Sequence, residues 1–130
     1  MSEYSIIFSI DIDLSGLSGA EGWNLPAFNA TALGKWSVVL DCSAHKDWAS
    51  PSNAIMVDPS GKEPAADGIF FHSKGDFNIG NIYSFEDSDV VSAMKEAEGR
   101  VSQGNKEGLN LQKDFTYDKS MEAILEIAGI

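Results

Sequence analysis

Apolar and polar residues alternate along the first part of the chain, from Tyr4 to Leu14. One face of this segment would carry Ile6, Phe8, Ile10, Ile12 and Leu14, and the other Ser5, Ser9, Asp11 and Asp13. A period of two is typical of a strand with one buried and one solvated face. Residues 35–42 alternate in the same way, which predicts a second strand.

Shorter apolar runs predict further strands over residues 54–57, 68–72 and 77–85, with brief candidates at 109–111 and 115–117. Turn residues separate several of these runs, including Pro59 to Lys62 and a hairpin turn at Ser73 to Asp76. About seven or eight short strands without βαβ alternation are typical of an antiparallel β-sandwich or barrel. We therefore expect a mainly β fold.

Helical spacing stands out in one segment, near residues 88–99. Val90, Met94 and Ala97 recur every three or four positions, and Asp87 or Ser88 could cap the start. The C-terminal segment 121–130 fits two patterns. As a strand it aligns Met121, Ala123, Leu125 and Ile127, and as a helix Met121, Ile124, Leu125 and Ala128. We favour the strand.

Length and charge narrow the class of protein. The chain has 130 residues and a mass of 14.0 kDa, which suits a single domain over residues 1–130. It carries 9 basic and 20 acidic residues, a net charge of −11, and its only arginine is Arg100. This balance disfavours nucleic acid and anionic membrane surfaces as partners, because both require clustered cations. It suits a basic partner, a cation or simple solubility.

Targeting and redox signals are sparse. The first residues lack a basic region and a cleavage site, so we expect a cytoplasmic protein, or one exported without a classical signal peptide. No apolar stretch is long enough to suggest a membrane span. Cys42 is the only cysteine, so no intrachain disulfide can form.

Asp11, Asp13 and Ser15 are a calcium candidate, because they copy the opening D-x-D-x-S-G of a calcium loop. The copy is incomplete: Gly22 occupies the twelfth position, where a bidentate glutamate belongs, and Glu21 comes one residue early. The simpler interpretation is the solvated face of the first strand followed by its turn.

Cys42, His45, His72 and Asp47 offer zinc ligands or a thiol–imidazole pair. A structural zinc site usually has two pairs of ligands, and here only one pair, C-x-x-H, is present. Nothing nearby supplies the electropositive field that a reactive thiolate needs. Cys42 also shares the apolar face of the second strand, which favours a buried small residue. We expect that the protein is not an enzyme and that it binds no cofactor, except that it could bind calcium.

Trp23 and Trp48 fall in segments between strands, beside Asn24 and Asp47. An aromatic face next to amide and carboxylate groups suits sugar recognition or a protein–protein contact. The alternative is that both indoles cover the ends of the core.

Three functions follow from these observations. The first is a non-enzymatic protein-binding or self-assembling module of inhibitor, immunity or structural-subunit type, whose partner is a basic protein or copies of itself. The alternative is a glycan-binding module with or without calcium, and the second alternative a small enzyme on a β scaffold. The first strand contains neither Lys nor Pro, which guard exposed edges, so we expect it to be central or paired with another chain.

Overall fold

The computed structural model describes residues 9–66, 68–69, 71–72 and 79–130. The fold is mixed α/β, 44% helical and 18% strand, with short strands in two small sheets. The prediction of a β-sandwich or barrel is therefore wrong. The strand patterns near residues 36 and 55 are confirmed, but these strands run parallel and helical segments connect them. Of the strand predicted from Tyr4 to Leu14, residues 4–8 lie outside the described residues, 9–11 are not strand and only 12–14 are, with Asp13 buried and Leu14 exposed, the reverse of the predicted faces.

The main sheet contains β1 (Ile12–Gly16), β2 (Trp36–Leu40) and β3 (Ile55–Val57), in the spatial order β1-β2-β3. Parallel neighbours need crossover connections. The helix α2 (Leu25–Ala32) joins β1 to β2, and the 3-10 helix η1 (Ser43–Asp47) lies between β2 and β3. Within the described residues β1 is an edge strand, whereas the sequence suggested a central or paired one.

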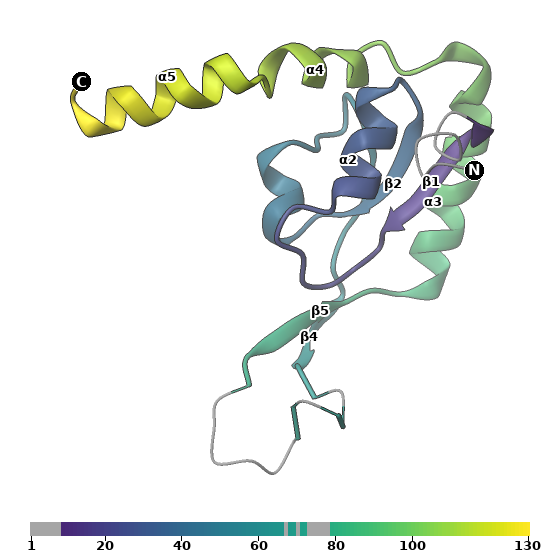
Figure 1. Ribbon diagram of the computed structural model, residues 1–130. Helices are drawn as coiled ribbons and strands as arrows, with labels where there is room; N and C mark the ends of the chain where they lie inside the picture. Colours follow the sequence, from purple (N-terminus) through teal and green to yellow (C-terminus); the bar gives the residue numbers. More distant parts are fainter. Residues whose placement is uncertain (1–8, 67, 70, 73–78) are drawn as a thin grey trace.

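The central strand β2 is buried at all five positions, as parallel strands covered on both faces usually are. Trp36, Val38 and Leu40 pack toward α3 (Asp87–Arg100), and Val39 packs with α2 residues on the opposite face. Helices thus cover both faces of the sheet (Figure 1). The predicted helix near residues 88–99 is confirmed as α3.

The helix α2 was not predicted, although its ends carry clear signals. Asn24 is its N-cap, with its side chain accepting from the backbone N–H of Ala27. Pro26 stands in the first turn, where its missing N–H costs nothing, and Gly34 follows the helix with φ +80°. The many apolar residues of this segment concealed a helix that is short and largely buried.

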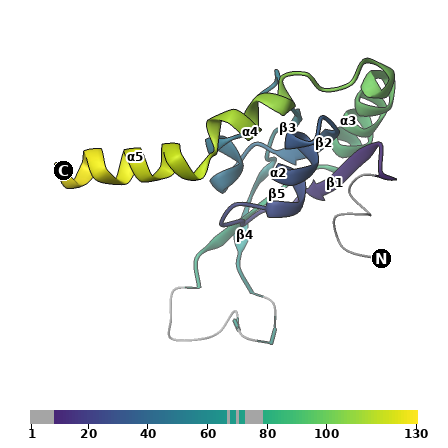
Figure 2. The same cartoon turned by 45° about the horizontal axis from the view of Figure 1, so that its top comes forward.

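The second sheet is an antiparallel hairpin of β4 (Gly61–Pro64) and β5 (Asn81–Ser84) that projects from the body (Figures 1 and 2). Its root is tied to the loop after β1, because the N–H of Tyr83 donates to the carbonyl of Gly19 at 3.0 Å. Of the predicted strand at 68–72, the described residues are not strand, and the predicted turn at 73–76 lies outside the described residues.

The C-terminal part is helical. The short helix α4 (Leu111–Asp114) leads into α5 (Tyr117–Ala128), so the strand predicted for residues 121–130 is wrong, as are the brief strands at 109–111 and 115–117. The side chain of Thr116 caps α5 by accepting from the N–H of Lys119, and Gly129 ends it with φ +71°. No helix among the described residues is long and apolar enough to cross a membrane.

Candidate functional site

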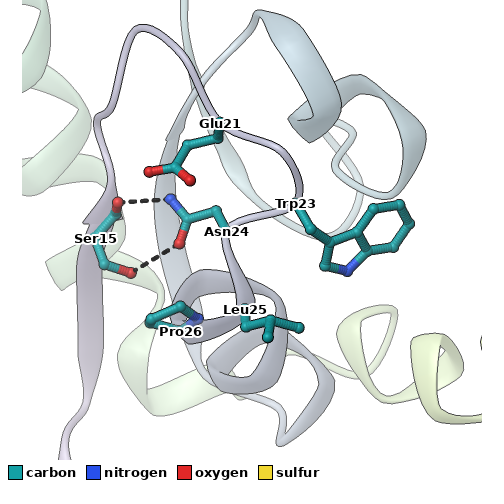
Figure 3. A pocket seen from close by; sticks show the side chains of 6 residues that line it. All are labelled: Ser15, Glu21, Trp23, Asn24, Leu25 and Pro26. Atoms are coloured by element: carbon teal, nitrogen blue, oxygen red, sulfur yellow. Dashed lines mark hydrogen bonds between the residues drawn. The ribbon is translucent and has the colours of Figure 1, made fainter.

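A pocket lies where β1 ends and α2 begins, with a cavity volume of about 480 Å³ (Figure 3). In α/β folds, ligands usually bind outside the carboxyl ends of parallel strands. The lining residues come from the end of β1, the following loop and the first turn of α2: Ser15, Glu21, Trp23, Asn24, Leu25 and Pro26. Trp23 and Asn24 were expected at a binding site, and the structure places both at this pocket.

Asn24 lines this pocket, and both polar atoms of its side chain form hydrogen bonds within the protein. Its Nδ2 donates to the carbonyl of Ser15 at 2.7 Å and contacts Nε2 of His45 at 3.2 Å, while its Oδ1 accepts from Ala27 N–H at 3.3 Å. The N–H of Phe28 donates to the carbonyl of Asn24, and Pro26 has no N–H. The start of α2 therefore offers little to an anion, unlike many helix N-termini.

His45 is completely buried and joins two loops at the carboxyl edge of the sheet. Its Nδ1 lies 2.8 Å from the carbonyl of Leu40. Because the amide of Asn24 is oriented by its bond to Ala27, Nε2 of His45 must accept, and the ring proton resides on Nδ1. Both ring nitrogens are occupied by structural bonds, so His45 has no free nitrogen to act as a base.

The predicted calcium trio is only partly assembled. The carboxylate of Asp13 accepts from the N–H and the hydroxyl of Ser15 at 3.1 and 2.9 Å, and Asp11 is exposed. Burial raises the pKa of Asp13 above its usual 3.8, and the hydrogen bonds from Ser15 oppose that shift. Among the residues that the structure describes, no three His, Cys, Asp or Glu side chains gather closely enough to hold a metal ion. Calcium binding stays a prediction.

Trp23 and Trp48 lie side by side but differ in exposure. The indole N–H of Trp48 donates to the carbonyl of Trp23 at 3.0 Å, and Trp48 is only 4% exposed. Trp23 is half-buried and contacts the ring of Phe115, with the centroids 5.3 Å apart. Asp47 is exposed on η1 and is not among the residues that line the pocket. The sugar-binding role of these residues stays a prediction, and of the two tryptophans only Trp23 is among the residues that line the pocket.

Cys42 is buried beside the loop after β1, and burial raises the pKa of its thiol, opposed by a hydrogen bond with Ser43. A raised pKa keeps the thiol protonated and poorly nucleophilic near neutral pH. His72 is exposed on the segment that connects β4 to β5. The thiol–imidazole pair considered from the sequence is therefore not prepared for catalysis.

The helix α5 carries several exposed apolar side chains. It projects from the body in both views (Figures 1 and 2), and none of its residues is buried. Tyr117 is 87% exposed and Ile124 57%. One face gathers apolar side chains at helical spacing, here called the α5 stripe: Tyr117, Met121, Ile124, Leu125 and Ala128.

An acidic ridge follows the α5 stripe along one side. It consists of Asp118, Glu122 and Glu126, which are four residues apart and so share one face. None of the three forms an ion pair with another described residue, whereas Lys119 pairs with Asp114 at 3.1 Å. The helix thus presents an apolar face that is bordered by the carboxylates of the acidic ridge.

A groove lies at the root of α5, between α2 and α4, with a volume of about 280 Å³. It is called the α2–α4 groove, and none of its lining residues is charged: Phe28, Asn29, Ala32, Leu33, Leu111, Gln112 and Phe115. A second groove of about 410 Å³ runs between β1 and α3, and Lys95 and Glu98 contribute charges to it.

Sequence reasoning missed the α2–α4 groove because it did not identify α2. Four of the five residues of the α5 stripe, all except Tyr117, appeared in the helical alternative for residues 121–130, and the cap at Thr116 was the signal that could have decided for it. Comparison with protein-family models, curated proteins and solved structures gives no significant match for this chain.

Proposed function

We propose that this protein is a non-enzymatic protein-binding module whose contact surface is the α5 stripe. The observation that carries the proposal is a helix of 12 residues without a single buried residue, which nevertheless displays a continuous apolar face. Contiguous exposed apolar surface usually marks an interaction site. An amphipathic helix that docks its apolar face into a groove is a common mode of recognition.

The physics of an isolated helix supports the same conclusion. Helices shorter than about 12–15 residues are marginal in water unless another surface packs against them. In the described part of the chain, α5 is held by its own hydrogen bonds, the Thr116 cap, the Gly129 terminus and one exposed ion pair from Lys119 to Asp114. A partner groove would bury Met121, Ile124 and Leu125 and so stabilise both the contact and the helix.

The residues that would carry chemistry give catalysis no support. His45 uses both ring nitrogens structurally, and the buried thiol of Cys42 has a raised pKa. A binding role requires neither group.

Site-specific photo-crosslinking tests the proposal. A benzophenone amino acid is placed at position 124, in the α5 stripe, and separately at position 58, which is exposed and far from α5 in sequence. After illumination of cells that naturally make the protein, we expect intermolecular adducts of defined mass from position 124 only. Equal adducts from both positions, or none from position 124, would overturn the proposal.

A further inference from the structure

We infer that the occupant of the α5 stripe is a second copy of this chain, with α5 of each copy seated in the α2–α4 groove of the other. This inference rests on the proposed function, because it names the partner for the same surface. It requires that the stripe and the groove match in chemistry, in position and in charge.

The chemistry of the groove matches the stripe. Phe28, Leu33 and Leu111 present apolar surface there, and no charged side chain lines it. The whole of α2 (LPAFNATA) contains no ionisable residue. An acidic helix that settles over α2 therefore meets no like charge, and its acidic ridge can stay in water on the outer face.

The position of the groove favours a reciprocal pair. Phe115 lines the groove and stands two residues before Tyr117, the first residue of the stripe. The groove and the stripe thus lie next to each other along the chain, and one chain that carries both halves of a contact is what a two-fold symmetric dimer needs. The groove between β1 and α3 is a poorer match, because it carries charges and α3 lies on the opposite side of the body from α5 in both views (Figures 1 and 2).

The amount of apolar surface is of the right order. A stable interface buries roughly 800 Å² on each partner. In a two-fold dimer each copy contributes both its stripe and its groove, including the rings of Tyr117, Phe115 and Phe28. Tyr117 is 87% exposed and Phe115 41%, so these two rings can contribute most, whereas Phe28 already packs against Trp48.

The net charge of the chain predicts how the dimer should respond to salt. Each copy carries −11, so two copies repel each other at low salt, and salt screens that repulsion over about 8 Å at physiological ionic strength. Dimerisation through uncharged surfaces should therefore strengthen as salt is added. Binding of the acidic ridge to a basic partner would instead weaken with salt.

The test is the molar mass of the full chain, measured by sedimentation equilibrium over a concentration series at low and high salt. We expect a monomer of 14.0 kDa in equilibrium with a species of twice that mass, with more dimer at high salt. The double variant Ile124→Ala/Leu125→Ala keeps good helix formers and should raise the dissociation constant by about a hundredfold or more. Met94→Ala, in the groove between β1 and α3, is the matched control and should leave the dimer unchanged.

A mixing experiment distinguishes stripe–groove contacts from pairing of two α5 helices. Leu33→Glu places a charge in the α2–α4 groove and leaves the stripe intact, so this variant should not dimerise alone. Mixed with Ile124→Ala/Leu125→Ala, it should form heterodimers, because one intact stripe then meets one intact groove. Circular dichroism of each variant establishes that it is folded.

Three results would overturn the inference: a monomer at every concentration and salt, a Leu33→Glu variant that dimerises alone, or a dimer that Met94→Ala disrupts and the stripe variant does not. If the chain is monomeric while position 124 still crosslinks to a different protein, the inference fails and the proposed function stands. Absence of both the dimer and the crosslink would remove both.

Discussion

The amide of Asn24 donates to Nε2 of His45 over 3.2 Å, and this bond joins the loop after β1 to the loop after β2. Asn24 also caps α2 and binds the carbonyl of Ser15, while His45 binds the carbonyl of Leu40. One buried pair thus holds the carboxyl edge of the sheet together with the start of the helix that forms one wall of the α2–α4 groove.

Asn24→Gly should lower the free energy of unfolding by about 2–3 kcal/mol, because it removes a helix cap and leaves buried His45 Nε2 without its donor. Asn24→Ala should cost roughly 1 kcal/mol more, since Asn24 has φ +61°, which glycine tolerates and alanine does not. Urea unfolding measures both.

Asn29→Ala, on the same helix, is the control for Asn24. Its side chain is half-buried, and we expect a change of about 0.5 kcal/mol or less. If Asn29→Ala lowered the free energy of unfolding as much as Asn24→Ala, the hydrogen bonds of Asn24 would contribute nothing beyond general packing.

Asp13 should make stability depend on pH. Burial raises its pKa in the folded protein, so the folded state binds the proton more readily than the unfolded chain, whose carboxyl titrates near 3.8. The contribution of Asp13 to stability therefore increases as the pH falls through the folded pKa, and it is complete below 3.8.

Comparison with Asp13→Asn isolates this contribution, because the other carboxyl groups are common to both proteins. The free energy of unfolding of the unmodified protein, minus that of Asp13→Asn, should grow as the pH is lowered from neutral. Asp11→Asn, at an exposed position just before the same strand, serves as the control. If the difference in free energy of unfolding between the unmodified protein and Asp13→Asn did not change with pH, burial would not raise the pKa of Asp13.

Gly19→Ala should loosen the projecting hairpin. A Cβ at position 19 would lie 2.0 Å from the carbonyl oxygen of Tyr83, so one backbone must move and the bond from Tyr83 N–H to Gly19 would be strained. Overpacking of this kind costs about 1–3 kcal/mol. Hydrogen exchange at the Tyr83 amide should accelerate in this variant.

Gly22→Ala is the matched control for Gly19, because nothing lies within 4 Å of a Cβ at that position. We expect its Tyr83 amide to exchange at the rate of the unmodified protein. Identical exchange in the Gly19 and Gly22 variants would show that the contact between the loop and the hairpin does not hold β5.

The candidate surfaces were only partly visible in the sequence. Trp23 and Asn24 were singled out, and both line the pocket at the end of β1. Glu21 was noted only as a misplaced calcium ligand, and the α2–α4 groove depends on a helix that was not identified. The α5 stripe needed the cap at Thr116, since the apolar residues of 121–130 fit two periods and favoured the strand.

Local pattern by itself determined the strands around residues 36–40 and 55–57 and the helix α3, because alternation and helical spacing report how a backbone segment places its own side chains. Local pattern did not determine α5, because the apolar residues of 121–130 favoured a strand, although the cap at Thr116 and the glycine at 129 that delimit the helix are local signals. Only the tertiary structure decided that the strands run parallel, because this depends on how the connecting helices pack against the two faces of the sheet. Ser37 shows the reason: its place between Trp36 and Val38 suggested a solvated face, yet it is fully buried, with its hydroxyl accepting from Thr31 at 2.8 Å beneath α2. A buried polar group that finds its partner on another element looks, in sequence, the same as one that faces water.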